Sequence, residues 1–249
     1  MVNDFLSRIE GNYYGYLVYL FGVLAVIFFS LLSREKKKKP EFLIPFLIVV
    51  VVFFYEFMGA FLMVNKSFNE KIHQLISNEP FQGWNLWVYN IFNYQVSKFL
   101  FLLLLWFNIH SKRKKNAVLF LMIIFSSYCL FLYVSPNSEI TNFQPLLYFL
   151  GNGLIIIASG LFFIDLVAED YFVSINPLTY WPFWYMTLIL FQMVIVFLGD
   201  VAFEYLAFEN VPVYKFFNTV SMVLYLLILG VFLRILFTGS NFIYSLNKK

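Results

Sequence analysis

Residues 83–116 read GWNLWVYNIFNYQVSKFLFLLLLWFNIHSKRKKN, and this stretch decides the fold class of the chain. It opens with aromatic and amide side chains, continues as a long apolar run, and stops at a basic cluster formed by residues 112–115. An apolar run of about 20 residues, flanked by aromatic residues at one end and by Lys or Arg at the other, is typical of a helix that crosses a bilayer. Because basic residues are retained on the cytoplasmic side of a membrane, the cluster also predicts the direction of this helix.

The composition of the whole chain agrees with a membrane protein. Hydrophobic residues make up 61% of the 249 residues and charged residues only 12%, against roughly 25% charged residues in soluble domains. Six further apolar runs resemble the first, so the sequence predicts an all-α fold, a polytopic seven-helix transmembrane bundle that occupies residues 1–249 as a single domain. The expected helices cover residues 13–32, 41–64, 85–110, 117–134, 145–166, 181–198 and 215–238.

The distribution of basic residues predicts the orientation of the bundle. The segments expected on one side hold 11 of the 17 Lys and Arg residues, and those expected on the other side hold four. We therefore expect the N-terminus outside and the C-terminus inside. Two amphipathic segments are expected to lie flat at the outer surface, one within residues 2–9 and one within residues 65–82. The apolar stripe of the second segment is formed by Phe68, Ile72, Leu75 and Ile76.

Glu56 and Lys98 are the most informative charged residues, because each is expected to lie within a membrane helix. A charged side chain at that depth costs about 3 kcal/mol or more, so each needs a partner or a polar cavity. Helices joined by a short loop usually pack as antiparallel neighbours, which predicts that these two side chains meet. The pair is either a structural contact that sets helix register or a site for a ligand or proton, and the sequence leaves both interpretations open.

Other polar side chains of the third, fifth and seventh helices recur at spacings of three, four or seven residues, which places them on shared helix faces. Such groups are more often contacts between helices than ligand-binding groups. Together with the two charged residues they predict a polar cavity in the outer half of the bundle, suited to a small amphipathic or lipid-like molecule. The candidate residues are Glu56, Asn90, Tyr94, Ser97, Lys98, Asn152, Asn218, Ser221 and Tyr225.

Several kinds of chemistry are not expected. Metal-dependent hydrolysis within a membrane needs His and carboxylate ligands that converge, and His73 and His110 are expected on opposite sides. The single cysteine, Cys129, excludes a metal site built on a pair of thiols. The basic residues sit in short clusters beside apolar runs, which argues against nucleic acid as a partner. We therefore expect no catalytic residue, no metal, no cofactor and no enzymatic activity.

Four features carry a resemblance to a known group of proteins: Glu56 within YEF, residues 84–99 (WNLWVYNIFNYQVSKF), residues 176–191 (NPLTYWPFWYMTLILF) and Asn218 within FFNTV. In these the chain resembles uncharacterised seven-helix membrane proteins of Bacteroidota that are often encoded beside sensor histidine kinases or response regulators. The resemblance implies a sensory or accessory subunit of the bacterial inner (cytoplasmic) membrane. Lys98 is not a feature of that group, so the resemblance implies no role for it.

These observations predict an integral membrane subunit that binds its ligand in the outer half of the bundle and couples to a cytoplasmic signalling protein. Residues 165–170 and the two basic loops are the expected docking surfaces, and membrane lipids are expected partners of the basic loops. A small transporter or channel that uses Glu56 and Lys98 is an alternative. A lipid-modifying membrane enzyme is disfavoured, because the expected helices contain few His, Cys and paired carboxylate side chains.

Overall fold

The computed structural model describes residues 12–77, 80–83, 85–135, 140–169 and 175–243. Over these ranges the chain is helical and forms no strand. Seven helices are long and apolar enough to cross a membrane, which confirms the predicted all-α membrane bundle. The expected amphipathic segment within residues 2–9 lies outside the described residues.

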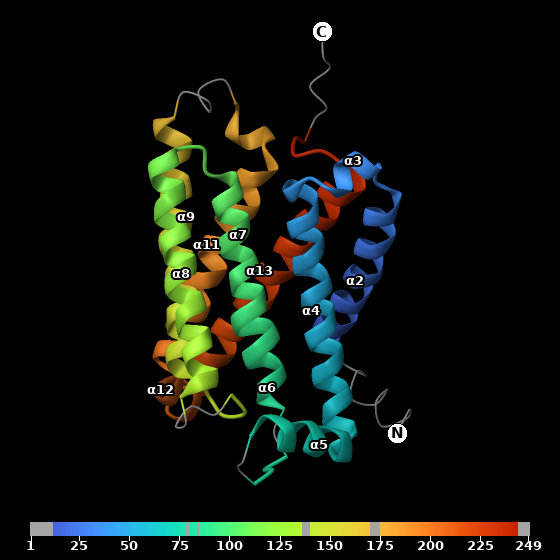
Figure 1. The fold of residues 1–249 in the computed structure, drawn as a ribbon, viewed down its shortest axis with the longest axis vertical. Helices are drawn as coiled ribbons and strands as arrows, with labels where there is room; N and C mark the ends of the chain where they lie inside the picture. Colours follow the sequence, from blue (N-terminus) through green and yellow to red (C-terminus); the bar gives the residue numbers. More distant parts are fainter. Residues whose placement is uncertain (1–11, 78–79, 84, 136–139, 170–174, 244–249) are drawn as a thin grey trace.

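The spanning helices run side by side along one axis (Figure 1). They are α2 (Tyr13–Leu31), α4 (Pro40–Val64), a composite of α6 (Leu86–Val88), η1 (Tyr89–Ser97) and α7 (Lys98–Asn108), then α8 (Lys112–Val134), α9 (Pro145–Ala168), α11 (Trp181–Val201) and α13 (Val211–Thr238). The shorter elements are α3 (Arg34–Lys37), α5 (Lys66–Ile76), the 3₁₀ turn η2 (Pro177–Thr179) and α12 (Phe203–Phe208).

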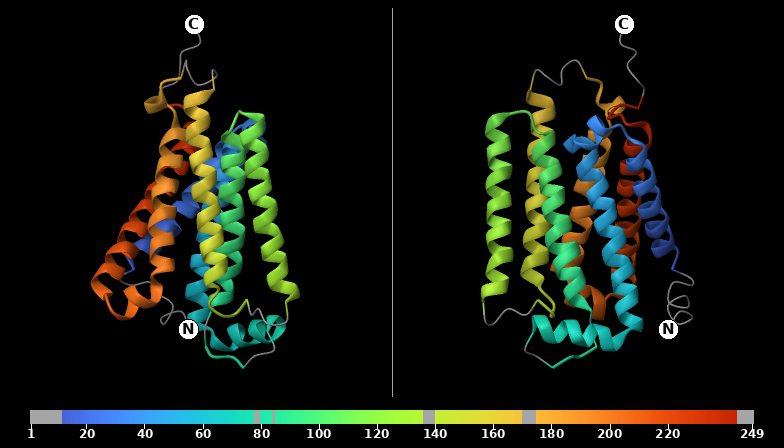
Figure 2. Two further views of the ribbon diagram at one scale, coloured as in Figure 1. Left: turned by 90° about the vertical axis from the view of Figure 1, so that its left-hand side faces the viewer. Right: turned by 45° about the vertical axis from the view of Figure 1, so that its right-hand side comes forward.

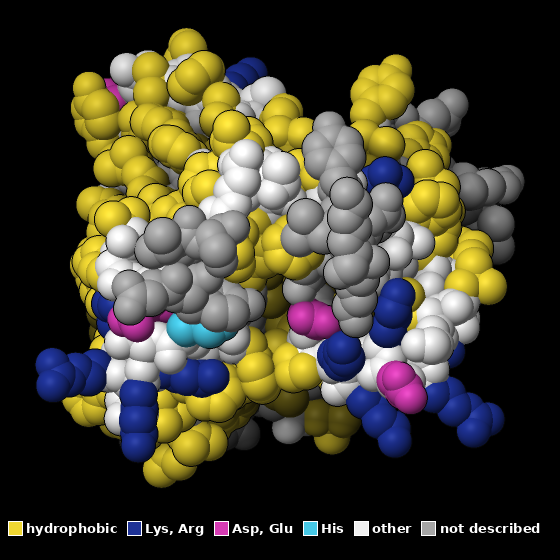
Figure 3. All heavy atoms as spheres, turned by 90° about the horizontal axis from the view of Figure 1, so that it is seen from above, with side chains coloured by type: hydrophobic (Ala, Val, Ile, Leu, Met, Phe, Trp, Pro, Cys, Tyr) yellow, Lys and Arg dark blue, Asp and Glu magenta, His cyan; other side chains and the backbone are white. Residues whose placement is uncertain are grey.

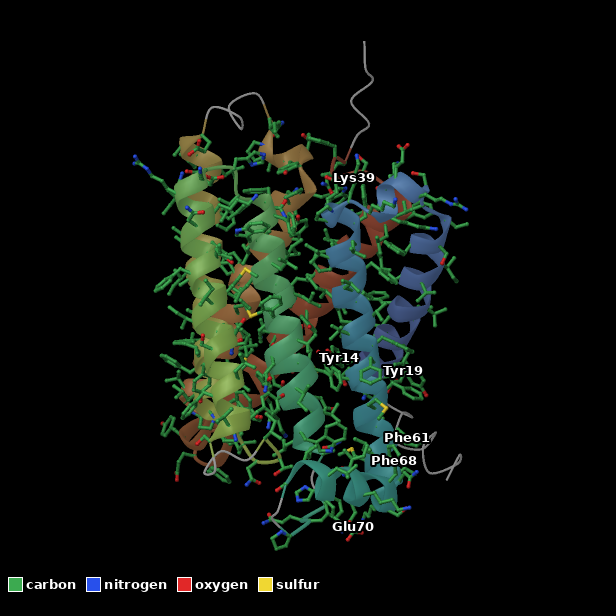
Figure 4. All side chains as sticks on the ribbon, in the orientation of Figure 1. Tyr14, Tyr19, Lys39, Phe61, Phe68 and Glu70 are labelled. Atoms are coloured by element: carbon green, nitrogen blue, oxygen red, sulfur yellow. The ribbon has the colours of Figure 1, made fainter. Side chains whose placement is uncertain are left out.

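The two ends of the bundle differ in their short elements. One end, called the α5 end, carries α5 and α12, and α2 begins there; the other, called the α3 end, carries α3, and α13 finishes there (Figures 1 and 2). In Figure 4 Glu70 marks the α5 end and Lys39 the α3 end. Figure 3 looks onto the α3 end and shows Lys and Arg side chains around its rim. The basic residues of α3 and of the first turn of α8 therefore gather at this end, whereas Lys66 and Lys71 of α5 lie at the other.

Three helices begin or finish three or more residues beyond their predicted bounds. The basic cluster forms the first turn of α8, which begins at Lys112 rather than at residue 117. α11 continues to Val201, so that Asp200 belongs to a helix and not to a loop. α13 begins at Val211, with a proline in its first turn, where the missing N–H is not needed. Hydropathy marks the apolar part of a helix, whereas its backbone hydrogen bonds continue into polar flanking residues.

α5 confirms that the second amphipathic segment is helical, and it lies across the end of the bundle (Figure 2). Its buried residues are polar: Asn69 and His73 face the protein, and Asn69 Oδ1 accepts a hydrogen bond of 3.0 Å from Trp87 Nε1. Phe68 packs edge-on against Phe61, and Leu75 is 84% exposed. Much of the apolar stripe therefore faces away from the core, as in a helix at a membrane surface.

Candidate functional site

A cavity of about 650 Å³ lies in the half of the bundle next to the α5 end. Residues of α2, α4, α6, η1, α7, α9, α11, α12 and α13 line it, so most of the spanning helices contribute. Most lining side chains are aromatic, amide or aliphatic, and three are ionisable: Glu56, Lys98 and Asp200. The volume falls within the range of roughly 300–1,000 Å³ that is typical of small-molecule sites.

The third spanning helix changes its backbone geometry where it reaches the cavity. Residues Tyr89–Ser97 form a π-helix of nine residues, and an α-helix continues from Lys98. π-Helical segments are rare and frequently occur at functional sites, because the wider turn rotates the side chains that follow. Tyr89, Asn93, Tyr94 and Lys98 all line the cavity from this segment and its junction.

Lys98 is 4% exposed, and its side chain reaches the cavity between η1 and α11. Its Nζ lies 3.2 Å from the Sδ of Met193 and 5.8 Å from the centroid of the Tyr94 ring. Asp200 is the carboxylate with which the ammonium group interacts electrostatically. A thioether is a weak acceptor, so the hydrogen-bonding capacity of the ammonium group is poorly used by the described residues.

Glu56 reaches the cavity from α4, where its carboxylate interacts with the Tyr14 hydroxyl of α2. The predicted ion pair between Glu56 and Lys98 is not formed, because Lys98 extends toward α11 while Glu56 faces α2. The two side chains nevertheless line one cavity, so a single ligand of suitable length can contact both.

Asp200 lies outside the predicted helix of residues 181–198 but within α11 of the structure. Its Oδ2 accepts a hydrogen bond of 2.8 Å from Asn152 Nδ2, which ties the last turn of α11 to α9. One signal was present: Gln192 and Asp200 are eight residues apart, about two helical turns, and therefore share a face if the helix continues. Gln192 lines the same cavity, and its buried Oε1 has no hydrogen-bond partner among the described residues.

The structure separates the nine predicted site residues into two groups. Those that line the cavity are Glu56, Tyr94, Lys98, Asn218, Ser221 and Tyr225. Asn90, Ser97 and Asn152 are buried behind the cavity wall. Asn90 Nδ2 donates to the carbonyls of Ile140 and Asn142 at 2.6 and 2.7 Å, and its Oδ1 accepts 2.6 Å from the Tyr148 hydroxyl. Asn90 therefore joins η1 to the segment before α9.

Five tyrosines of the site were missed: Tyr14, Tyr55, Tyr89, Tyr148 and Tyr214 line the cavity. The chain contains 17 tyrosines, and a tyrosine near the end of a membrane helix is ordinarily interpreted as an interfacial anchor. No pattern in the sequence distinguishes an anchor from a cavity residue, because the difference depends on how each helix is rotated about its axis.

At the α3 end a different carboxylate forms a fully satisfied cluster. Asp165 is completely buried; its Oδ2 accepts 2.7 Å from the backbone N–H of His110, and its Oδ1 accepts 3.2 Å from that of Ser111 and 3.1 Å from Lys114 Nζ. Lys114 also contacts Glu169 at 3.0 Å. The Asp165 side chain itself is therefore not available to a partner, because it holds the α7–α8 turn against α9. The docking role expected for residues 165–170 stays a prediction. Asp170 lies outside the described residues.

No protein-family model, curated protein or solved structure matches this chain. The class that the fold defines is a multi-pass membrane protein with seven spanning helices. In the part of the chain that the structure describes, no group of three or more His, Cys, Asp or Glu side chains is placed to hold a metal ion.

Proposed function

We propose that this protein is a membrane sensory or accessory subunit that binds a small amphipathic molecule in the cavity and passes its occupancy to a cytoplasmic partner. The observation that carries the proposal is the presence of three ionisable side chains, Glu56, Lys98 and Asp200, on the wall of one cavity within the bundle. Ionisable groups at membrane depth are costly, and those that persist usually mark ligand or ion pathways.

The protein is proposed to lie in a bacterial inner membrane, with the α5 end outside the cell membrane and the α3 end in the cytoplasm. Basic residues gather at the α3 end, in α3 and in the first turn of α8 (Figure 3). The rule that positive residues stay in the cytoplasm supports this orientation. A ligand would then reach the cavity from outside, and the α3 end would meet the partner.

The proposed route of transmission is α13. On the wall of the cavity the Tyr225 hydroxyl of α13 lies 3.4 Å from that of Tyr55 in α4 and 3.5 Å from Ser97 Oγ in η1. At the α3 end the residues after α13 bind the start of α11, because the N–H of Trp181 donates to the Asn241 carbonyl at 2.9 Å. A ligand that displaces Tyr225 would therefore act on a helix anchored at the opposite end.

The test of the ligand site fills the cavity at Gly199. This glycine lines the cavity, and a Cβ atom placed on it meets no atom within 4 Å, so that Gly199→Phe adds a ring to open space. Gly160→Phe is the matched control, because Gly160 has equal room and does not line the cavity. Mass spectrometry of the purified proteins should find a small molecule with the wild type and with Gly160→Phe, and should lose it with Gly199→Phe. Retention of that molecule by Gly199→Phe would contradict the proposal.

The test of the coupling is affinity purification of the tagged protein in mild detergent, with mass spectrometry of the accompanying proteins. A kinase, a response regulator or another cytoplasmic module is the expected companion. Recovery of the chain with no cytoplasmic protein, under conditions that keep membrane complexes intact, would contradict the coupling and leave the ligand site standing.

A small transporter is the second candidate, favoured by the π-helix that interrupts the third spanning helix beside the cavity. Irregular helices at membrane depth form substrate and ion sites in many transporters. Uptake into reconstituted vesicles that depends on an ion gradient, and that is lost in Lys98→Met, would favour this candidate over the sensory subunit.

A further inference from the structure

The charges on the cavity wall do not balance. Lys98 and Asp200 are of opposite sign and interact with each other, whereas Glu56 faces tyrosines. When all three groups are ionised, these side chains carry a formal charge of minus one. A cationic group beside Glu56 would neutralise this charge, whereas Lys98 already has Asp200 as its counter-charge.

The surroundings of Glu56 are aromatic. Tyr14, Tyr55, Tyr89 and Tyr225 all line the cavity together with its carboxylate. The rings of Tyr55 and Tyr89 are 5.8 Å apart at 64°, in an edge-to-face arrangement. In Figure 4 Tyr14 and Tyr19 lie beside the half of α4 nearest the α5 end. Several tyrosine side chains near one carboxylate offer a cation both aromatic surface and a counter-charge, the two features that sites for organic ammonium groups combine.

Gly59 permits this arrangement on α4. A Cβ atom on Gly59 would collide with the Tyr89 hydroxyl, so the absence of a side chain allows the Tyr89 ring to lie close to α4, one helical turn from Glu56. The remainder of the cavity wall includes apolar side chains such as Ile195, Val196 and Met222. A ligand with a cationic head and an apolar body matches both parts.

We propose that the cavity binds an organic ammonium compound, with its cationic head held by Glu56 and the surrounding tyrosines and its apolar body against α11 and α13. This inference rests on the proposed function, because it names the ligand class of the same cavity. A compact metal ion fits less well, since the site offers one carboxylate and aromatic rings instead of the six or more oxygen ligands that hard cations prefer.

The test compares two probes of the same shape, choline and its neutral carbon isostere 3,3-dimethyl-1-butanol. Equilibrium dialysis against the full chain in a nonionic detergent should show that choline binds at least about tenfold more tightly, because only choline carries the charge that the rings and the carboxylate attract. Equal affinity for the two probes would overturn the inference, and so would the absence of choline binding at millimolar concentration.

Substitutions test which residues cause the preference for choline over its neutral isostere. Glu56→Gln should bring choline down to the affinity of its isostere, whereas Glu35→Gln, which removes an exposed carboxylate from α3, should leave the preference intact. Tyr89→Phe should keep the preference and Tyr89→Leu should weaken it several-fold, which provides a second test if Glu56→Gln does not fold. A preference that persists in Glu56→Gln would overturn the inference.

Gly199→Phe distinguishes a failure of the ammonium inference from a failure of the proposed function. Equal binding of both probes that Gly199→Phe abolishes would overturn the ammonium inference and leave the cavity as a ligand site. If Gly199→Phe retained the co-purified molecule, the proposed function would fail, whichever probe bound better.

Discussion

Asp165 and Asp200 are both carboxylates near the ends of spanning helices, yet their surroundings are opposite. Asp165, at the α3 end, accepts hydrogen bonds from two backbone N–H groups and from Lys114. Asp200, near the α5 end, accepts a hydrogen bond from Asn152 and lines a cavity. The difference shows that the α3 end satisfies its charges internally, whereas the other half keeps charges available to whatever occupies the cavity.

The third spanning helix crosses both regions and changes character between them. In α7 the side chains of Phe101, Leu102, Leu104 and Leu105 are completely buried in the apolar core. In η1 several side chains line the cavity instead, and the backbone is π-helical. Close packing therefore stabilises the α7 half of this helix, whereas the η1 half is less closely packed because it lines the cavity.

The largest effect is expected for Asp165→Asn. An amide oxygen can replace one acceptor, but the amide NH₂ group then faces a donor, so charge-assisted hydrogen bonds worth about 3 kcal/mol in total are lost. The unfolding midpoint in detergent should fall clearly. Glu169→Gln is the control, since it removes the more exposed partner of Lys114, and its midpoint should change little. A fall no larger than that of Glu169→Gln would contradict the conclusion that the Asp165 hydrogen bonds stabilise the fold.

Gly22→Leu should come next. The ring and Cβ of Phe53 occupy the place of a side chain at Gly22, so the larger residue must separate α2 from α4 at a cost of about 1–3 kcal/mol. Gly199→Leu should leave the unfolding midpoint nearly unchanged, because its new side chain enters the cavity. Equal destabilisation of the two variants would mean that the cavity is not open space.

Asp200→Asn should affect stability less than Asp165→Asn, by about 1 kcal/mol or less. The amide oxygen still accepts from Asn152, and the rest of the group faces the cavity, where water can bind it. Binding should change more than stability, and dialysis with the probes above measures it. A loss of stability as large as that of Asp165→Asn would show that Asp200 is a structural group.

The smallest effect on stability is expected at Leu75, which is 84% exposed on α5. Leu75→Glu should leave the unfolding midpoint in detergent unchanged, because the side chain packs against nothing that folding buries. A contact of Leu75 with lipid should be measurable only in a bilayer. In a Cys129→Ala background, a spin label at Leu75→Cys should be more accessible to oxygen than one at Glu70→Cys, since the apolar face of an interfacial helix enters the lipid. Equal accessibility would place α5 away from the membrane surface.

The seven helices were predictable from the sequence, and their bounds were correct to within a few residues, except that α8 and α13 begin earlier. The polar residues Glu56, Lys98 and Ser221 were recognisable because such groups are rare in apolar runs. The π-helix, the inward position of Asp200 and the tyrosines of the cavity were not predictable. These features depend on how neighbouring helices pack, and short-range patterns along the chain do not record that packing.

The amino-acid sequence is enough to predict a membrane bundle with an excess of basic residues on one side, because length, hydropathy and charge along each segment are local properties. Which charged groups meet depends on the packing of the helices. Lys98 lies with Met193 and Asp200 and not with Glu56, because the rotation of each helix about its axis is set by packing against the others. Glu56 consequently lies near tyrosines, so the cavity combines a carboxylate with aromatic side chains on one part of its wall.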